Sequence, residues 1–168
     1  MILVLGGARS GKSRYAERLV TACPPPWVYV ATAEPRDDEM RERIAQHRAR
    51  RGPDWRVIEA PRDLAGALAT HAAGGAVLVD CLTLWLSNLM LADVDIAAAT
   101  ERLEAVLSGM AGPVVVVSNE VGLGIVPDNA LARRFRDAQG RLNQRIAARA
   151  ERVVLMVAGL PLVVKGDP

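Results

Sequence analysis

The sequence has few aromatic residues, few cysteines and almost no lysine. Only 4% of its 168 residues are aromatic, whereas 51% are hydrophobic, so Val, Leu, Ile and Ala must supply most of the core. The two cysteines, Cys23 and Cys81, lack the spacing of metal ligands, which predicts reduced thiols. Lys12 and Lys165 are the only lysines, and arginine carries nearly all of the positive charge.

The chain also lacks a strong net charge, a long apolar run and a secretory pattern. A net charge of +2 does not indicate nucleic-acid binding, and we expect no nucleic-acid partner. The apolar runs are shorter than the roughly 20 residues of a membrane span. Met1 leads directly into a short apolar stretch without a basic n-region. These absences predict a cytoplasmic protein, with residues 1–168 forming one domain.

Short apolar segments alternate with segments of helical composition. The pattern predicts strands at 2–5, 27–31, 56–58, 76–79, 114–117, 153–157 and 162–164. It predicts helices at 14–23, 37–51, 63–73, 82–91, 96–107 and 131–150. A turn is expected at 159–161, between the last two strands. This alternation predicts an α/β fold with a largely parallel central sheet flanked by helices.

The segment between the first strand and the first helix matches the phosphate-binding pattern G-x-x-x-x-G-K-[ST] in full. Its residues are Gly6, Gly7, Ala8, Arg9, Ser10, Gly11, Lys12 and Ser13. Glycines let successive N–H groups face phosphate oxygens, and the following helix adds its positive end. Lys12 is expected to reach the β- and γ-phosphates, and the Ser13 hydroxyl to ligate Mg²⁺. A chance match is expected about once in a hundred such chains. The motif therefore predicts a P-loop NTPase fold that binds a nucleoside triphosphate, without saying which reaction follows.

Asp80 follows the predicted strand at 76–79 and is the candidate second ligand of a metal site. A carboxylate at the end of a buried strand is well placed to hold Mg²⁺ or its water beside the Ser13 hydroxyl. The alternative is that Asp80 only caps the turn that follows its strand. The P-loop, which needs such a carboxylate, favours the metal site.

His47 lies near the end of the helix predicted at 37–51. Arg43 and Arg51 are each about one turn from it, which would place them on the same face. A histidine there can simply add a cation where arginines already complement the helix dipole. Alternatively, its imidazole can attack phosphorus while guanidinium groups hold the polyphosphate and offset charge on the leaving group. The residues alone leave both readings open.

Several segments together resemble one family, the bifunctional adenosylcobinamide kinases and adenosylcobinamide-phosphate guanylyltransferases of cobalamin biosynthesis. The matching segments are Gly6–Arg14, Tyr29–Ala33, Asp38–Met40, Arg43–Ile44, His47–Arg48, Trp55–Arg56, Glu59, Asp80–Thr83, Ser118–Pro127 and Leu131–Gln144. The segment at 119–127 is distinctive, because no general rule for P-loops requires it.

The resemblance implies two reactions. A nucleoside triphosphate, ATP or GTP, donates its γ-phosphoryl group to the hydroxyl of adenosylcobinamide. The histidine matching His47 then attacks the α-phosphorus of GTP, and the guanylyl-histidine passes GMP to adenosylcobinamide phosphate. The resemblance also implies Mg²⁺ as cofactor and a homo-oligomer, expected to be a trimer. The preference for GTP comes from the resemblance alone, since the chain has no Asn-Lys-x-Asp segment to read guanine.

The resemblance places further nucleotide contacts outside the P-loop. They fall on Ala31, Thr32, Ala33, Arg48, Ala49, Arg50, Arg51, Glu59 and Asp80. The segment 122–129 has two open interpretations. It is either a turn that starts the last long helix, or a wall of the corrinoid site or of a subunit interface.

Two alternatives to the bifunctional enzyme fit the residues. A plain P-loop kinase for a small molecule would transfer the γ-phosphoryl group and use His47 only structurally. A regulatory nucleotide-binding switch would hydrolyse its nucleotide slowly and bind a partner protein. The absence of a guanine-reading motif argues against the switch.

Overall fold

The computed structural model describes residues 1–49, 51–71 and 75–167. Its strands are β1 (Ile2–Gly6), β2 (Trp27–Ala31), β3 (Trp55–Glu59), β4 (Ala76–Asp80), β5 (Val114–Asn119), β6 (Arg152–Val157) and β7 (Leu160–Lys165). Its helices are α1 (Lys12–Thr21), α2 (Asp38–Ala49), α3 (Leu64–His71), α4 (Leu82–Leu91), α5 (Ile96–Gly109) and α6 (Ala130–Arg149).

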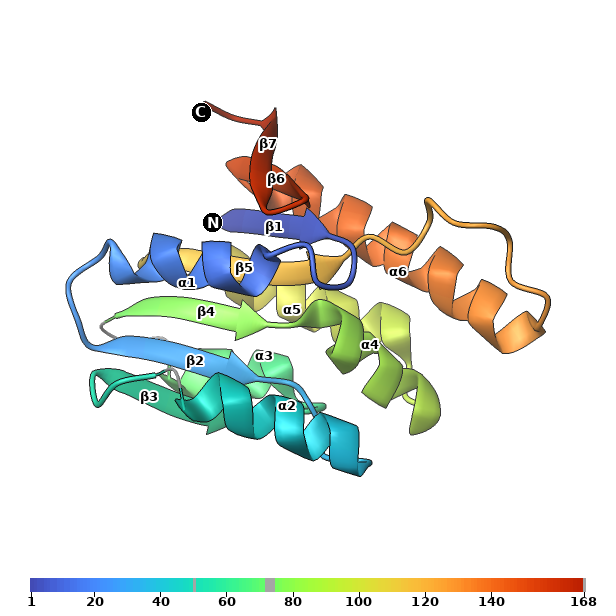
Figure 1. The fold of residues 1–168 in the computed structure, drawn as a ribbon, viewed down its shortest axis with the longest axis horizontal. Helices are drawn as coiled ribbons and strands as arrows, with labels where there is room; N and C mark the ends of the chain where they lie inside the picture. The colour runs from blue at the N-terminus through green and yellow to red at the C-terminus, as the bar shows by residue number, and fades with distance from the viewer. Residues whose placement is uncertain (50, 72–74, 168) are drawn as a thin grey trace.

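The strands form one sheet in the order β3-β2-β4-β5-β1-β6-β7 (Figure 1). Every neighbouring pair is parallel except β6 and β7, which form an antiparallel hairpin. The predicted α/β fold with a largely parallel sheet is therefore confirmed. Because parallel strands point the same way, Gly6, Asp80 and Asn119 end their strands at one edge, where ligands bind in such sheets.

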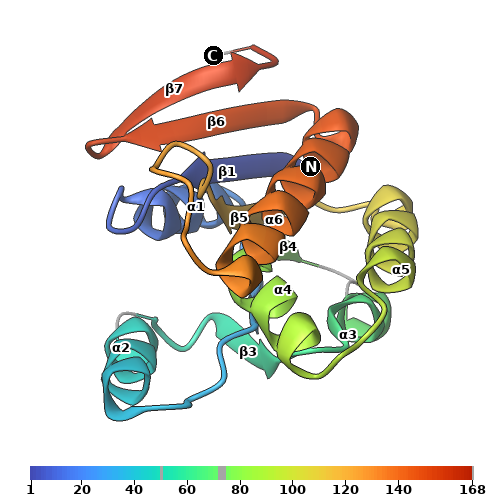
Figure 2. The same cartoon turned by 90° about the vertical axis from the view of Figure 1, so that its right-hand side faces the viewer.

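Helices cover both faces of the sheet, as Figure 2 shows: α1 lies on one face, and α3, α4, α5 and α6 lie on the other. Successive strand residues divide between two apolar layers, since side chains alternate along a strand. Val28 and Val30 pack toward Trp85 and the larger group of helices, whereas Tyr29 packs with Val20 under α1. This two-sided burial explains why the parallel strands read as short apolar runs in the sequence.

Two local predictions were wrong. The predicted helix at 37–51 ends at Ala49, so Arg51 lies outside it, and the guanidinium of Arg51 stacks on Tyr29 of the sheet. Pro161 was expected in a turn but lies in β7, paired with Met156. An edge strand tolerates proline because one side of its backbone makes no ladder hydrogen bonds. The predicted end of the third helix, near Ala73, lies outside the described residues.

Candidate nucleotide site

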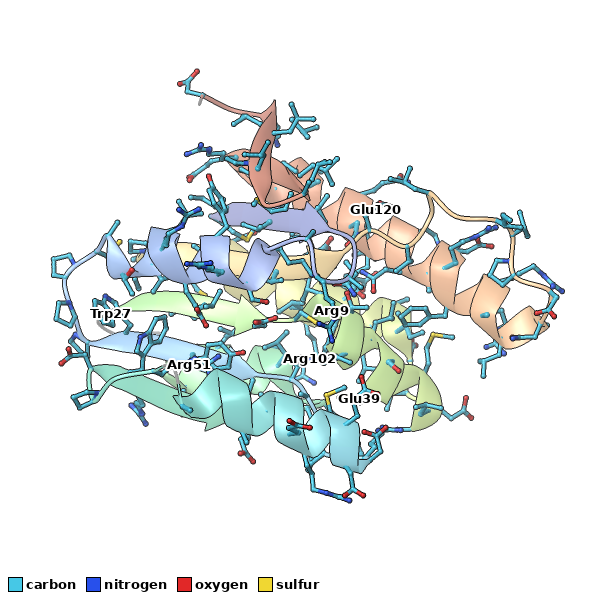
Figure 3. The ribbon with its side chains drawn as sticks, viewed as in Figure 1. Arg9, Trp27, Glu39, Arg51, Arg102 and Glu120 are labelled. Atoms are coloured by element: carbon cyan, nitrogen blue, oxygen red, sulfur yellow. The ribbon has the colours of Figure 1, made fainter. Side chains whose placement is uncertain are left out.

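The predicted phosphate loop joins β1 to α1. Arg9 and Gly11 have positive φ angles of 55° and 91°, which turn the backbone sharply before α1 begins at Lys12. The Ser10 N–H donates to the Gly7 carbonyl at 3.3 Å, and the Lys12 ammonium donates to the same carbonyl at 2.9 Å. The chain thus curls into the compact loop that the motif predicts, with Arg9 at the loop in Figure 3.

The turn between β6 and β7 contacts this loop and supports it. Its Gly159 N–H donates to the Ser10 carbonyl at 3.0 Å. Gly6 allows a second close approach, because a Cβ there would lie 2.5 Å from the Ser10 Oγ and 2.9 Å from the Met156 carbonyl. The sequence motif did not reveal that the last hairpin supports the phosphate loop, since the two segments lie at opposite ends of the chain.

A cavity of about 420 Å³ opens at the carboxyl edge of the sheet, between the phosphate loop and α2. Side chains from both strands and helices line it: Lys12, Ser13, Tyr29, Ala31, Ala33, Pro35, Met40, Arg41, Ile44, Ala45, Arg51, Val57, Glu59, Asp80, Cys81, Leu84 and Asn119. It therefore joins predicted contacts from five separate segments: Lys12 with Ser13, Ala31 with Ala33, Arg51, Glu59 and Asp80.

The remaining predicted site residues outside the phosphate loop are Thr32 and the segment 47–50. Thr32 is buried, and its hydroxyl donates to the Cys81 carbonyl at 2.7 Å and accepts from the Cys81 N–H at 2.8 Å. Ala49 is exposed at the end of α2. Arg50 lies outside the described residues. His47 and Arg48 belong to α2, but their side chains lie outside what the structure describes.

Asp80 is linked to a buried tyrosine that the sequence reading missed. The Tyr29 hydroxyl donates to Asp80 Oδ2 at 3.2 Å. Burial raises the pKa of Tyr29 well above its ordinary value, and the negative charge of Asp80 raises it further. The hydroxyl therefore stays protonated and fixes one carboxylate oxygen.

The Arg51 guanidinium lies 3.2 Å from the centre of the Tyr29 ring, below α1 in Figure 3. Its side chain is 5% exposed, and its Nη2 lies 3.6 Å from a Glu17 carboxylate oxygen. Within the described part of the chain, its Nε and Nη2 atoms have no hydrogen-bond partner. A buried cation with unused donors at a cavity wall is suited to an anionic ligand.

Cys81 follows Asp80 and also lines the cavity. Burial raises the pKa of its thiol to about 11, with a smaller contribution from the Asp80 charge. The thiol form therefore predominates at neutral pH, and the nucleophilic thiolate is disfavoured. Cys23 and Cys81 are both free, as predicted.

The oxygen donors at the cavity suit Mg²⁺. Ser13 and Asp80 line the same space, and Mg²⁺ is commonly held by one or two protein oxygens together with substrate phosphates. Among the described residues, no group of three or more His, Cys, Asp or Glu side chains forms a self-sufficient metal cage.

Comparison with known families assigns the chain to a family. The family described as cobinamide kinase / cobinamide phosphate guanyltransferase matches residues 2–164. The chain belongs to this family. The resemblance seen in the sequence is therefore confirmed, and with it the assignment to an enzyme family of kinases and nucleotidyltransferases.

Curated relatives agree over their full lengths. The chain is 52% identical to the bifunctional adenosylcobalamin biosynthesis protein CobP of Pseudomonas aeruginosa, covering 99% of this chain and 98% of the relative. It is 42% identical to the bifunctional adenosylcobalamin biosynthesis protein CobU of Salmonella typhimurium, covering 98% and 99%.

A solved structure supports the fold independently. It is an ATPase from the type III secretion system of pathogenic bacteria, with a TM-score of 0.53 and 12% identity. The match covers 92% of this chain and 50% of that one. This likeness shows the P-loop fold alone.

Within the described residues, no helix is both long and apolar enough to cross a bilayer.

Proposed function

We propose that this chain carries both activities of its family. It phosphorylates adenosylcobinamide with a nucleoside triphosphate, and it then transfers GMP from GTP to give adenosylcobinamide-GDP. The observation that carries the proposal is that the phosphate loop and α2 line the same cavity. Lys12 and Ser13 of the phosphate loop, Asp80 and the α2 residues Met40 and Ile44 line one space.

In the kinase step, the acceptor hydroxyl attacks the γ-phosphorus, the bond to the β–γ bridging oxygen breaks, and the nucleoside diphosphate leaves. The backbone N–H groups of the phosphate loop and Lys12 hold the phosphates in line with the acceptor. Ser13 and Asp80 would hold Mg²⁺, which supplies positive charge to the phosphate oxygens when bound.

In the guanylyltransferase step, an imidazole nitrogen of His47 attacks the α-phosphorus of GTP and pyrophosphate leaves. Position 47 lies about one helical turn beyond Ile44, one of the α2 residues at the cavity. A phosphate oxygen of adenosylcobinamide phosphate then attacks the same phosphorus and releases His47. Lys12 and Arg51 offset the charge that develops on the leaving pyrophosphate.

Mg²⁺ as cofactor, ATP and GTP as nucleotides, a cytoplasmic location and assembly into a trimer belong to the same proposal. The basis for the trimer is family membership together with the exposed apolar side chains of the edge strand β7, among them Leu160, Leu162 and Val164.

A product assay tests the proposal. The protein is incubated with adenosylcobinamide, Mg²⁺, ATP and GTP, and the corrinoids are separated by chromatography. We expect adenosylcobinamide phosphate first and adenosylcobinamide-GDP later, with the His47→Asn variant stopping at the phosphate. A wild type that also stops at the phosphate would favour the plain kinase, and no corrinoid product at all would contradict both.

A further inference from the structure

Asn119 is a cavity residue to which the proposed chemistry gives no role. It is the last residue of β5, the strand between β1 and β4 in the sheet. It pairs with Gly6, where the phosphate loop starts, and the neighbouring strand β4 ends at Asp80. Asn119 therefore lies between the phosphate loop and Asp80, and it lines the same cavity as Lys12 and Ser13.

The backbone of Asn119 is held from both sides. Its N–H donates to the Thr83 hydroxyl of α4 at 2.7 Å, and its carbonyl accepts from the Asn143 carboxamide of α6 at 3.0 Å. Its own carboxamide has no hydrogen bond within the described part of the chain. The structure thus fixes the residue by its main chain and keeps its side chain available.

A buried polar network supports this arrangement. Asn143 Oδ1 accepts from the Ser118 hydroxyl at 2.7 Å and from Gln139 Nε2 at 2.9 Å. Gln139 Nε2 also donates to the Ser118 Oγ at 2.9 Å. Ser118 and Gln139 are completely buried, and Asn143 is 7% exposed. These hydrogen bonds offset part of the cost of burying three polar side chains, although Gln139 Oε1 has no hydrogen-bond partner among the described residues. They hold the end of β5 in a fixed orientation.

We propose that the Asn119 carboxamide donates a hydrogen bond to the terminal phosphate of a bound nucleoside triphosphate. The inference rests on the proposed function, because it assumes that a triphosphate occupies the cavity. A neutral amide suits this place: it donates to an anionic oxygen without competing with Lys12, and it does not repel phosphate as a second carboxylate beside Asp80 would. Thr83 and Asn143 are positioning residues that act through the Asn119 backbone.

The contact gives the enzyme a means of recognising the γ-phosphate itself. The loop N–H groups and the Ser13 hydroxyl serve the phosphates of diphosphate and triphosphate alike. A donor at the end of β5 is engaged only when a terminal phosphate is present. Asn119 therefore favours the triphosphate that both reactions consume over the diphosphate that the kinase step releases.

The test compares a triphosphate with a diphosphate. The α,β-methylene analogues of GTP and GDP are used with Mg²⁺, because their α–β bridge cannot be cleaved by His47. Their dissociation constants are measured by calorimetry for the wild type, Asn119→Ala and Asn119→Asp. Gln144→Ala and Gln144→Glu are matched controls, since Gln144 is an exposed amide on α6.

We expect Asn119→Ala to weaken the triphosphate analogue about ten- to hundredfold, the range for a hydrogen bond to a charged group, and the diphosphate analogue less than about threefold. Asn119→Asp should weaken the triphosphate further, because its carboxylate repels the phosphate. The Gln144 variants should bind like the wild type. Thr83→Val should lose part of the discrimination, whereas Thr83→Ser, which keeps the hydroxyl, should retain it.

Equal weakening of both analogues by Asn119→Ala, or no weakening, would overturn the assignment. An Asn119→Asp variant that binds the triphosphate as tightly as the wild type would also overturn it, because the side-chain oxygen would then serve a cation. A wild type that binds neither analogue would contradict the proposed function itself as well as this inference.

Discussion

At the scale of single residues, the candidate nucleotide site combines cationic side chains with oxygen atoms that hydrogen bonds hold in place. Lys12 is only 6% exposed, and Arg51 is buried against Tyr29. The hydroxyl of the same tyrosine donates to the Asp80 carboxylate and fixes one of its oxygen atoms. In a partly enclosed cavity, such charges act on a phosphate more strongly than they would in water. We therefore expect a small number of such groups to hold the proposed triphosphate.

Lys12→Met is the sharpest test of the phosphate loop. It keeps the length of the side chain but removes the ammonium, so we expect both activities to fall about a hundredfold or more, as with loss of a charge-stabilising group. The matched control is Lys165→Met, which changes the only other lysine, an exposed residue that caps the end of α6 through Ala147 and Ala148. It should retain activity. Steady-state rates of corrinoid phosphorylation and of GMP transfer are measured for both variants. Equal losses in the two variants would argue against the assigned role of Lys12.

The predicted residues that line the cavity are mostly those that stand in a short local sequence pattern. Lys12 and Ser13 stand in one short motif, and Asp80 follows an apolar strand. Tyr29, Asn119 and Gly159 were missed because their roles depend on strand order and on contacts between distant segments. Arg51 was predicted in the site, but on the wrong element. The stack on Tyr29 that positions it is a tertiary contact, and helical spacing could not anticipate it.

At the scale of elements, α5 and α6 are joined by a charged cluster beneath the sheet. The Glu104 carboxylate is 4% exposed and accepts from Arg145 Nε at 2.8 Å and Nη2 at 2.6 Å, while Arg149 Nη2 lies 3.2 Å away. The hydrogen bonds from Arg145 hold the pKa of Glu104 below its ordinary value of 4.5, helped by the charges of both arginines. These ion pairs hold α6, the helix that carries Gln139 and Asn143, against α5.

Glu104→Gln should destabilise the fold by about 1–3 kcal/mol at pH 7, the range for losing one hydrogen-bond partner, because Arg145 and Arg149 are partly exposed to solvent. Because the pKa of Glu104 is lower in the folded state, its contribution is present above the unfolded value and is lost as the pH falls through the folded value. The difference between wild type and variant should therefore narrow below about pH 4.5. Urea unfolding at several pH values measures it, and a difference that does not depend on pH would contradict this account.

Two helical glycines give a contrasting pair. Gly140 lies within α6 with nothing near its missing Cβ, so Gly140→Ala should stabilise the protein by about 0.5–1 kcal/mol through helix propensity. In α3, a Cβ on Gly66 would collide with the Asp63 carboxylate, which accepts from the Gly66 N–H. Gly66→Ala should therefore give no such gain. Thermal unfolding compares the two, and an equal gain from both would contradict the contact at Asp63.

The element types could be predicted from the sequence, because short continuous apolar runs indicate buried parallel strands and the segments between them have helical composition. Helix 82–91 has the predicted limits, and the others differ by a few residues. The predicted ends of elements were wrong where tertiary contacts determine them, as at Arg51 after α2 and at Pro161 in β7. The order of strands was not predicted at all. Nothing local in β5 indicates that it inserts between β1 and β4, which is what brings Asn119 to the cavity.

At the scale of the whole molecule, the sheet brings together groups from most of the chain. The phosphate loop comes from the first strand, Asp80 from the fourth, Asn119 from the fifth, and the brace at Gly159 from the last hairpin (Figure 1). The second strand of that hairpin, β7, forms one edge of the sheet and carries exposed apolar side chains. Such an edge is a surface that self-association would cover.

The proposed trimer makes a simple prediction. Light scattering coupled to gel filtration should give a mass of three times the 18.0 kDa of the chain. Association that buries apolar surface should persist at high salt. A species of 18.0 kDa across the micromolar range would contradict the trimer without affecting the assigned chemistry.

The most direct measurement of the central claim is a search for the covalent nucleotide. The protein is incubated with Mg²⁺ and GTP labelled at the α-phosphate, denatured and separated from free nucleotide. A phosphoramidate predicts a bound label that is labile in acid and stable in base, that is absent from His47→Ala, and that passes to adenosylcobinamide phosphate when this acceptor is added. A wild type that retains no label, or a label that persists in His47→Ala, would contradict the guanylyltransferase mechanism.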